Sequence, residues 1–410
     1  MLVERCKGSK DSLPGEMARF RRVEDVFRDS CRKWGYGEVR TPTIEYLHLF
    51  TSTGTLTPEM LGRVYSFLDW DGWSGERVVL RPDGTIPVAR LYIDSLVAKG
   101  PARLCYVTNV FTFEPTGREN REKWQLGAEF IGNGSYLADV ELITLALEVL
   151  ARLGLKDIEI RLSHAGIIGA LLQKAGLGTE EEAKLFDSIA AGKLGALGKL
   201  KSSHPKLERG LSLLGVKGKS AAYLKNLKAL FADDFPEIGI ALDNFIATTG
   251  ALSSLGMDYE IDIATGRGFE YYTGTMFQIS SCGVRVGGGG RYDALIPLMG
   301  GKDTPASGFA LYLDSIVGLL GQEVVSKPVS VLIKVSPDNL SAAFTAARCL
   351  REAGYVSEFA TAVSGKTDGD WLLEVGKGGT FKLTYRKTRR KYRGKSLDEI
   401  VSRLGKRRHL

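Results

Sequence analysis

The chain has 410 residues, 44% of them hydrophobic and 25% charged, and a formal net charge of +7. This length suffices for about two or three domains with a sizeable core, and the composition excludes a disordered or fibrous chain. No stretch approaches the roughly 18 consecutive apolar residues of a membrane span, and the charged N-terminus lacks the apolar stretch of a signal peptide, so we expect a cytoplasmic protein without a membrane segment.

The cysteines and histidines indicate neither a disulfide framework nor a metal site. The five cysteines are scattered and odd in number, and none lies in a C-x-x-C pair. The four histidines also lack the spacing of metal ligands. We therefore expect no metal and no cofactor.

A long helix followed by a strand opens the fold. Apolar residues recur at helical spacing from Glu16 to Lys33, which predicts an amphipathic helix. Gly35 and Gly37 end it. Residues 38–45 are typical of a strand, and Pro42 within them favours an edge or interface position, because proline cannot donate to a central ladder.

A turn between a strand and a helix carries two polar side chains. Residues 77–80 predict a strand and residues 86–97 a helix, and Asp83 and Thr85 lie in the turn that joins them. These side chains can hold the ammonium group of a ligand, or they can simply cap the helix. The residues themselves leave both interpretations open.

The next two strands form a hairpin with a polar face. Residues 104–113 and 124–132 are the predicted strands, and a polar loop joins them. Because strand side chains alternate, Gln125, Gly127 and Glu129 share one face. An amide and a carboxylate separated by a glycine would make the polar floor of a pocket.

The remaining pattern predicts one large domain, residues 1–325, and a small α/β module, residues 326–410. Within the large domain, residues 165–249 are helical throughout with short glycine breaks, which favours an inserted helical domain. Further elements are expected as a helix at 138–153, a strand at 158–162, a strand passing into a helix at 307–317, and a β, α, β, β order at 329–333, 340–353, 371–375 and 381–385.

The stretch from Gly266 to Gly274 combines one cation with two aromatic hydroxyl groups. Arg267, Tyr271 and Tyr272 precede a strand-like run, and four consecutive glycines follow at 287–290. Glycine lets a ligand approach the backbone closely, so this stretch outlines a small-molecule pocket. A tyrosine pair in a sheet core is the alternative.

Positive charge is concentrated at the C-terminal end. Residues 382–410 contain twelve lysines and arginines against two acidic residues, so the rest of the chain is close to neutral. The run from Tyr385 to Arg393 interleaves tyrosines with basic side chains, which suits a phosphate backbone such as that of RNA. A solvated or disordered basic end is the alternative.

Taken together, these stretches resemble the class II aminoacyl-tRNA synthetase catalytic fold, and within it the histidyl branch, over about residues 5–320. Each match alone would be weak, but five in the same order are specific. The matching stretches are Lys7–Asp11, Arg81–Thr85, Gln125–Gly132, Arg267–Tyr272 and Gly289–Asp293.

The resemblance implies an α+β fold with a six- or seven-stranded antiparallel sheet flanked by helices, a homodimer across the first helix and strand, and a pocket for histidine. An ammonium group requires acceptors and a carboxylate a guanidinium, while each imidazole nitrogen requires a donor or an acceptor. The residues carried over are Asp83, Thr85 and Gln125 for the ammonium, Arg267 for the carboxylate, and Glu129 and Tyr272, with Tyr271 beside them, for the imidazole. Asp83 stands where the synthetases have glutamate.

Two positions depart from the synthetase pattern. Thr112 and Ser315 stand where synthetases place the arginines that hold the phosphates of ATP, and only Arg118 and Arg121 are near enough in sequence to substitute. Tyr312 replaces a glycine and should crowd the adenine floor. Losing one such charge-assisted contact costs on the order of 10²–10³ in rate, so adenylate formation is not expected.

A synthetase-like fold that keeps the amino-acid pocket and lacks the ATP contacts resembles the regulatory subunits of ATP phosphoribosyltransferase, which act in the first step of histidine biosynthesis. The phrases at 103–106, 271–274 and 308–314 are similar to that family. The resemblance implies no catalytic residues, a short-form catalytic subunit as partner, a homodimer within a hetero-oligomer, and feedback by L-histidine.

The C-terminal module is the feature that regulatory subunits usually lack. Residues 329–410 resemble a shortened anticodon-binding domain with the basic end attached. A histidyl-tRNA synthetase, or an RNA-binding relative without catalysis, is therefore the alternative. Another amino-acid-dependent sensor or ligase on the same fold is a third interpretation.

Overall fold

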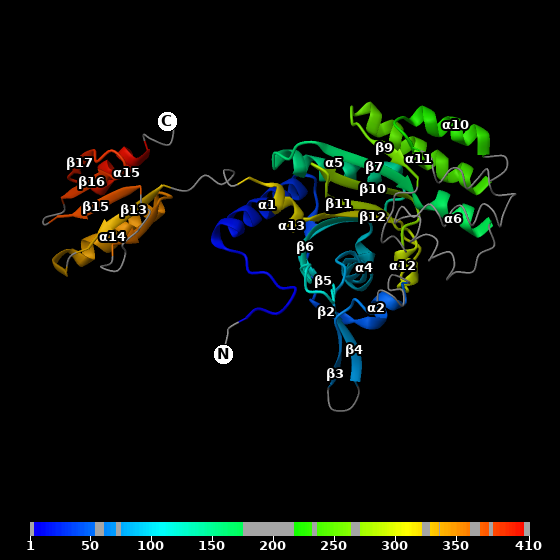
Figure 1. Ribbon diagram of the computed structural model, residues 1–410, viewed down its shortest axis with the longest axis horizontal. Coiled ribbons are helices and arrows are strands. Elements are labelled where there is room, and N and C mark those ends of the chain that lie inside the picture. The colour runs from blue at the N-terminus through cyan, green and yellow to red at the C-terminus, as the bar shows by residue number, and fades with distance from the viewer. Residues whose placement is uncertain are drawn as a thin grey trace. The chain divides into compact units, whose positions relative to one another are not determined.

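The computed structural model describes residues 4–53, 61–70, 75–174, 217–231, 236–263, 271–321, 329–335, 337–360, 370–376 and 380–405. The chain divides into two compact units, Met1–Val324 and Val325–Leu410. Figure 1 labels their helices and strands. The five stretches that resemble the synthetase catalytic fold fall in the first unit.

The first unit is built on a sheet of nine described strands. Their order is β1-β5-β6-β12-β11-β10-β7-β9-β8, and the six from β5 to β7 are antiparallel. The predicted antiparallel α+β fold is confirmed, but the sheet is wider than expected, because β1 and β9 add parallel pairs to β5 and β7. The strands are β1 (Gly37–Glu38), β5 (Ala102–Phe111), β6 (Glu122–Ile131), β12 (Ala306–Tyr312), β11 (Val284–Arg291), β10 (Thr275–Ser281), β7 (Ile158–His164), β9 (Glu260–Asp262) and β8 (Lys217–Gly218).

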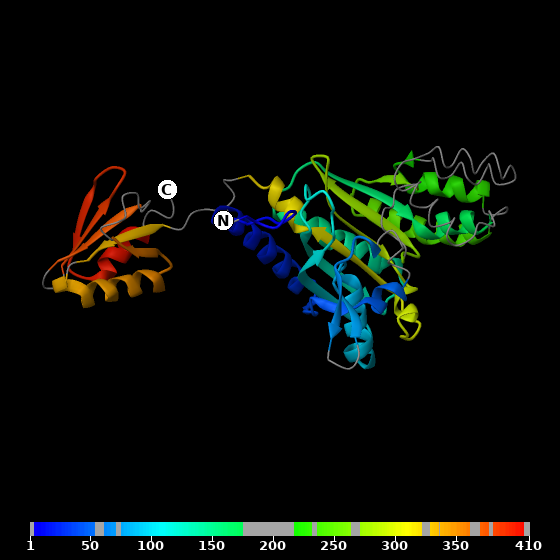
Figure 2. The same cartoon turned by 60° about the horizontal axis from the view of Figure 1, so that its bottom comes forward.

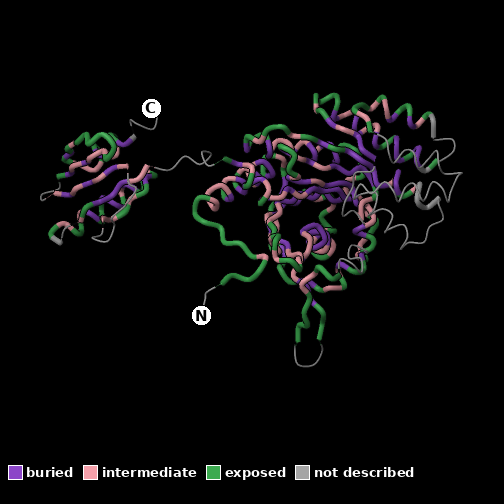
Figure 3. The backbone as a smooth tube through the Cα atoms, in the orientation of Figure 1, coloured by how far each residue is buried: buried purple, intermediate pink, exposed green. Residues whose placement is uncertain are grey.

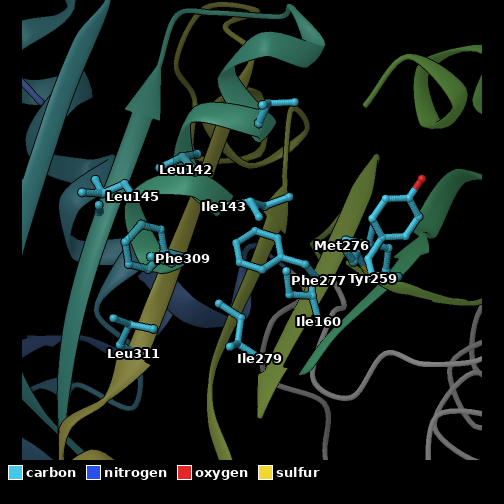
Figure 4. Packing of buried hydrophobic residues seen from close by; sticks show 14 of the residues in the cluster. Leu142, Ile143, Leu145, Ile160, Tyr259, Met276, Phe277, Ile279, Phe309 and Leu311 are labelled. Atoms are coloured by element: carbon cyan, nitrogen blue, oxygen red, sulfur yellow. The ribbon is translucent and has the colours of Figure 1, made fainter. Parts of the chain in front are cut away.

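Several helices pack against one face of this sheet, three of them over its central strands (Figure 2). Phe309 and Leu311 of β12 and Phe277 and Ile279 of β10 point into the core, where Ile143 lies among them (Figure 4). Each such fully buried side chain contributes about 1.5–3 kcal/mol relative to exposure. The helices are α1 (Pro14–Lys33), α5 (Tyr136–Arg152) and α13 (Leu313–Leu319).

The first helix follows the sequence prediction closely. α1 begins at Pro14, whose fixed φ and missing N–H suit the first turn. Phe20, Val23 and Phe27 recur at helical spacing and are buried. Beyond the helix, Gly35 has a φ of 80°, the left-handed conformation that commonly terminates a helix.

A second apolar cluster packs against the opposite face of the sheet, near β5. Ile86 and Val88 contribute from α4, Leu104 and Tyr106 from β5, and Leu295 from α12. This cluster covers one end of that face and borders the polar residues of the site. The helices are α4 (Thr85–Leu91), α12 (Leu295–Leu298) and α2 (Leu47–Thr51).

The helix predicted at residues 86–97 is not a uniform α-helix. α4 ends at Leu91, a π-helical turn follows at Tyr92–Leu96, and a 3₁₀ turn follows at Val97–Lys99. π-turns are usually single insertions within a helix. The apolar spacing predicted the length of the segment but not its change of hydrogen-bond pattern.

The single strand predicted at residues 38–45 is wrong. β1 ends at Glu38, and β2 (Ile44–Tyr46) belongs to a separate sheet of order β2-β4-β3, with β4 at Gly75–Leu80 and β3 at Ser66–Trp70. Between them the backbone has other partners, because the Arg81 guanidinium donates to the carbonyls of Thr41 and Pro42, both at 2.9 Å. All of β3 is exposed (Figure 3).

The described parts of residues 165–249 are mainly helical. They comprise α6 (Ala165–Lys174), α10 (Ala221–Phe231) and α11, which runs from Pro236 to Ser254. α11 packs against both α6 and α5. Because residues 175–216 lie outside the described residues, the inserted helical domain stays a prediction.

The second unit has its own five-stranded sheet and apolar core. The order is β14-β13-β15-β16-β17, and Val331, Leu373 and Leu383 of the sheet are buried together with Leu350 and Ile400 of the helices. It has one more strand at each edge than the β, α, β, β prediction. The elements are β13 (Ser330–Lys334), α14 (Leu340–Glu352), β14 (Val356–Phe359), β15 (Trp371–Val375), β16 (Phe381–Tyr385), β17 (Lys391–Gly394) and α15 (Leu397–Gly405).

The basic run is a folded hairpin, which corrects the alternative of a disordered end for residues 381–405. β16 pairs with β17, and the amide of Tyr385 donates to the carbonyl of Arg390 at 2.8 Å. Arg389 in the turn has a φ of 56°. The turn residues 386–391 are all exposed, so their positive charge faces solvent on a fixed backbone.

Candidate functional site

The face of the central sheet opposite α5 has a floor of very small residues. Register places Gly127 of β6, Ala310 of β12 and Gly288 of β11 in one row, and Gly308 and Gly290 in the next. Directly paired residues of an antiparallel sheet share a face, so these five positions form a nearly flat surface. We call this surface the glycine floor.

Glu129 lies at one end of the glycine floor and is completely buried. Its Oε1 accepts hydrogen bonds from Thr85 Oγ1 at 2.8 Å and from the Tyr106 hydroxyl at 3.2 Å. The Tyr292 hydroxyl donates to its Oε2. Side chains from three separate segments thus fix the carboxyl group in one orientation. A fixed orientation suits a group that hydrogen-bonds to a ligand.

At two positions of the floor only glycine fits, because other side chains lie directly against the backbone there. A Cβ on Gly308 would overlap the Glu129 carboxylate, and a Cβ on Gly127 would overlap the Tyr106 ring. Both glycines lie in strand interiors, where glycine is usually unfavourable. The side chains around Glu129 therefore rest directly on the backbone of the floor.

Burial controls the protonation of this cluster. It raises the pKa of Glu129 to about 8, although the hydrogen bonds from Tyr292 and Thr85 lower it, and the nearby charge of Asp83 raises it further. Burial also raises the pKa of Tyr106 and of Tyr292 well above its usual range. At neutral pH the cluster is largely uncharged, so Glu129 can donate a proton as well as accept one.

Asp83 caps α4 and also belongs to the site. Its Oδ1 accepts a hydrogen bond from the Ile86 amide at 2.9 Å, which is the capping interpretation. Burial raises its pKa, and its charge in turn raises the pKa of Glu129 and Tyr272. Asp83 is therefore close to the cluster. Its contact with an ammonium group stays a prediction.

Gln125 carries a buried oxygen without a partner. It lies on the floor side of β6, paired with Thr108 on β5 and with Tyr312 on β12. Its Oε1 is buried and accepts no hydrogen bond from the described residues. A buried acceptor without a donor is costly, so this oxygen is suited to an N–H group of a ligand.

Three tyrosine rings meet beside Glu129. The ring centroids of Tyr271 and Tyr272 are 4.9 Å apart, and that of Tyr292 lies 5.6 Å from the first and 6.3 Å from the second. The predicted site residues Thr85, Glu129, Tyr271 and Tyr272 are therefore brought together, next to Asp83.

Tyr106 and Tyr292 were not predicted as site residues. Both stand within stretches that resemble related proteins, yet the strand register that places them on Glu129 is not visible in the sequence. In the sequence, only the alternation of buried and floor-side positions along the strands could have indicated that these tyrosines face the site.

Arg267, predicted to hold a carboxylate, lies outside the described residues. Another motif arginine, Arg291, is buried and bound internally, with Nη2 2.8 Å and Nε 3.2 Å from the two Asp139 carboxylate oxygens. It also donates to the carbonyls of Asn133 and Ser135. Arg291 thus joins β11 to α5, on the face away from the floor.

Arg121, one of the two arginines that could substitute at the positions that lack synthetase arginines, is held elsewhere. The Thr112 amide pairs with the Arg121 carbonyl, and the Arg121 guanidinium donates to the Glu114 carbonyl at 2.7 and 2.9 Å. That guanidinium also stacks 4.8 Å from the Phe113 ring centroid. Arg121 is therefore engaged in holding the hairpin loop.

The described residues contain neither a metal site nor a membrane segment. Nowhere in them do three or more histidine, cysteine, aspartate or glutamate side chains gather in a way that could hold a metal ion. In the same ranges no helix is long and apolar enough to cross a bilayer.

Comparison with known proteins agrees with this geometry. Residues 8–316 match the family model described as histidyl-tRNA synthetase. The chain belongs to the histidyl-tRNA synthetase family. The match spans the first unit and includes every residue predicted for the site.

Relatives within the family divide into two groups. A protein of Dehalococcoides mccartyi strain BAV1 named ATP phosphoribosyltransferase regulatory subunit is 54% identical over 360 residues, which are 87% of each chain. A histidine–tRNA ligase of Archaeoglobus fulgidus is 34% identical, over 87% of this chain and 85% of the ligase. The predicted resemblance to regulatory subunits is confirmed.

A solved structure shows the same architecture. A protein of Bacillus halodurans described as an ATP phosphoribosyltransferase regulatory subunit/histidyl-tRNA synthetase superimposes with a TM-score of 0.76 at 28% identity. The match covers 90% of this chain and 95% of that one. The shared fold therefore extends over most of both chains.

Proposed function

We propose that the chain is a regulatory subunit of ATP phosphoribosyltransferase that binds L-histidine on the glycine floor and performs no chemistry of its own. The relatives that carry this name at up to 54% identity support the role. Histidine is our own assignment of the ligand, and it rests on the side chains around Glu129.

One observation carries the proposal. The hydrogen-bonded cluster of Glu129 with Thr85, Tyr106 and Tyr292 is intact, whereas neither Thr112 nor Ser315 offers a cation to a nucleotide. The chain has kept groups that suit an amino acid and lacks, at these two motif positions, the arginines that hold the phosphates of ATP. Binding without adenylation is what this combination supports.

The chemistry of the floor matches the polar groups of histidine. A protonated Glu129 can donate to one imidazole nitrogen, and a tyrosine hydroxyl can serve the other. The unpartnered oxygen of Gln125 and the carboxylate of Asp83 are acceptors for the ammonium group. We propose Arg267 for the carboxylate, as a guanidinium binds it through two parallel hydrogen bonds.

Regulation requires a partner whose activity depends on the bound state. We propose the short-form catalytic subunit as that partner, with this chain as a homodimer across α1 and β1 within the hetero-oligomer. Histidine then inhibits by favouring one arrangement of the complex, with a coupling of about 1–3 kcal/mol, which corresponds to about 5–150-fold in affinity.

The second unit has a separate proposed role. Its fold and its exposed basic turn support a shortened anticodon-binding domain whose hairpin contacts RNA. Nothing in the proposed histidine response depends on this contact.

The deciding experiment measures binding and activation of histidine in parallel. Titration calorimetry with L-histidine should show binding to the wild type and a loss of affinity in Arg267→Ala, and histidine-dependent ATP–pyrophosphate exchange should be absent. Adding the catalytic subunit should give a joint complex whose activity L-histidine lowers. Exchange by the purified chain would instead identify a synthetase, and unchanged affinity in Arg267→Ala would reject the pocket assignment.

A further inference from the structure

Arg285 is directed to the floor side of the sheet by an irregularity in β11. The register with β10 shifts here, so Ser280 opposes Arg285 and Val286 is the extra residue. Strict alternation from Gly288 would place Val286 on the floor and Arg285 in the core, yet Val286 is fully buried in the helix-covered core. Bulges commonly redirect a side chain in this way beside functional sites.

The Arg285 guanidinium lies close to both a floor glycine and an aromatic ring. Its Nη2 is 3.3 Å from the position that a Gly288 Cβ would occupy, and its Cζ is 5.6 Å from the Tyr312 ring centroid. Its Nε is buried and has no hydrogen-bond partner in the described part of the chain. The same ranges contain no carboxylate paired with it. Within the part of the chain that the structure describes, Arg285 is thus a partly buried cation without a carboxylate partner.

The residues around this guanidinium are uncharged and polar. Ser280 lies opposite Arg285, Gln278 lies opposite Gly288, and Gln125 lies opposite Tyr312. The next carboxylate in this row, Glu159 opposite Ser280 on β7, is exposed and pairs with Arg161 at 3.8 Å. A hydroxyl and amide groups beside a free guanidinium are groups that bind an oxyanion.

We propose that Arg285 and Tyr312 form a subsite for the phosphate group of a small phosphorylated ligand, next to the amino-acid pocket. The Glu129 carboxylate lies over Gly308 of β12, so the guanidinium at Gly288 of β11 lies one strand across and about one row along from it, roughly 8 Å away by strand geometry. A carboxylate on an amino acid held by Glu129 has its own proposed arginine at Arg267. A planar guanidinium supported by an aromatic ring presents two parallel donors, which fit phosphate oxygens.

Titration calorimetry with pyrophosphate as the probe tests this subsite on the full chain. We expect the wild type to bind it, Arg285→Gln to lose at least about tenfold in affinity, and Arg285→Lys to lie between them, because lysine keeps the charge without the fork. Arg161→Gln removes an exposed arginine of β7, two strands away from β11, and should leave the affinity unchanged. The L-histidine affinity of all three variants should equal that of the wild type.

Three results would overturn the subsite. The first is a wild type that does not bind pyrophosphate, and the second is an equal loss in Arg161→Gln. The third is an Arg285→Gln variant that binds pyrophosphate normally but loses L-histidine, which would assign Arg285 to the amino-acid carboxylate. Urea unfolding shows whether each variant is folded. If Arg285→Gln does not fold, the pyrophosphate affinity of Arg285→Lys tests the subsite in its place. Because the two ligands are titrated separately, failure of the subsite leaves the histidine proposal intact.

Discussion

Gly308 and Glu129 oppose each other across the β6–β12 pair, and the glycine is what allows the glutamate side chain to lie flat on the sheet. Gly308 has no room for a Cβ, because the Glu129 carboxylate occupies that space. The position of the carboxyl group thus depends on an absent side chain on the neighbouring strand as well as on its three hydroxyl donors.

We expect Gly308→Ala to displace Glu129 and to weaken L-histidine binding at least tenfold, with a loss of about 1–3 kcal/mol in the free energy of unfolding from overpacking. Gly318→Ala is the matched control, since Gly318 lies in α13 with open space around its Cα. That variant should be neutral or slightly more stable. Calorimetry and urea unfolding measure both quantities, and equal behaviour of the two variants would contradict the role of Gly308.

The pKa of Glu129, raised by burial to about 8, predicts a specific pH dependence. The folded protein holds a proton that the unfolded chain releases near its ordinary pKa of 4.5. The stability from this group is therefore complete below pH 4.5 and is lost as pH rises towards 8, with a slope of at most about 1.4 kcal/mol per pH unit.

Glu129→Gln should remove that dependence, because glutamine does not titrate. Urea unfolding of both proteins between pH 5 and 8.5 measures the difference in slope. Parallel curves for wild type and variant would show that Glu129 does not hold the proton.

Gln125→Met separates ligand binding from structure. Methionine is similar in length but removes the buried oxygen that has no partner among the described residues. We expect unchanged or slightly increased stability together with a loss of about tenfold in L-histidine affinity, since only the ligand uses this acceptor. A variant that is destabilised and binds normally would show that Gln125 has a structural partner instead.

For the Arg291–Asp139 pair we expect reduced stability with unchanged L-histidine affinity, the reverse of Gln125→Met. Asp139→Asn removes the nearer of two carboxylates that pair with the buried guanidinium and leaves Asp293 at 3.2 Å, so the loss in the free energy of unfolding should approach, but not exceed, the about 3–5 kcal/mol of a broken buried pair. L-histidine affinity of the folded variant should change little, because the pair lies on the helix-covered face. Glu159→Gln, which breaks the exposed pair with Arg161, should change stability by less than about 1 kcal/mol.

The basic hairpin can be tested by removing charge without disturbing its turn. Asparagine tolerates the left-handed backbone of position 389, so Arg389→Asn with Arg390→Gln should leave the fold intact. We expect weaker binding to single-stranded RNA and a shallower salt dependence, by about 0.7 per lost phosphate contact. Lys334→Gln, from an ion pair with Glu374 in the same unit, is the control. An unchanged salt dependence in the double variant would reject the RNA contact.

Much of the central hairpin could be predicted because its alternation is strong. The strands expected at 104–113 and 124–132 lie within two residues of β5 and β6. The shared face of Gln125 and Glu129 followed from the same alternation and holds in the structure, where they pair with Tyr312 and Gly308 of β12.

What could not be predicted depends on contacts between distant segments. Tyr106 and Tyr292 reach Glu129 only through the strand register, and Arg285 reaches the floor only because β11 contains an extra residue. The break around Pro42 depends on the guanidinium of Arg81, which lies forty residues away in the sequence. Local periodicity carries none of this information.

The two outermost described strands of the central sheet, β1 and β8, have only two residues each. Such short edge strands offer few free backbone groups to an incoming strand. The sheet is therefore poorly suited to edge-to-edge pairing with the sheet of another molecule. In the proposed homodimer, a second copy beside β1 would therefore be recognised through side chains, including those of α1. Substitutions on the surface of that helix should consequently alter assembly without changing the ligand floor.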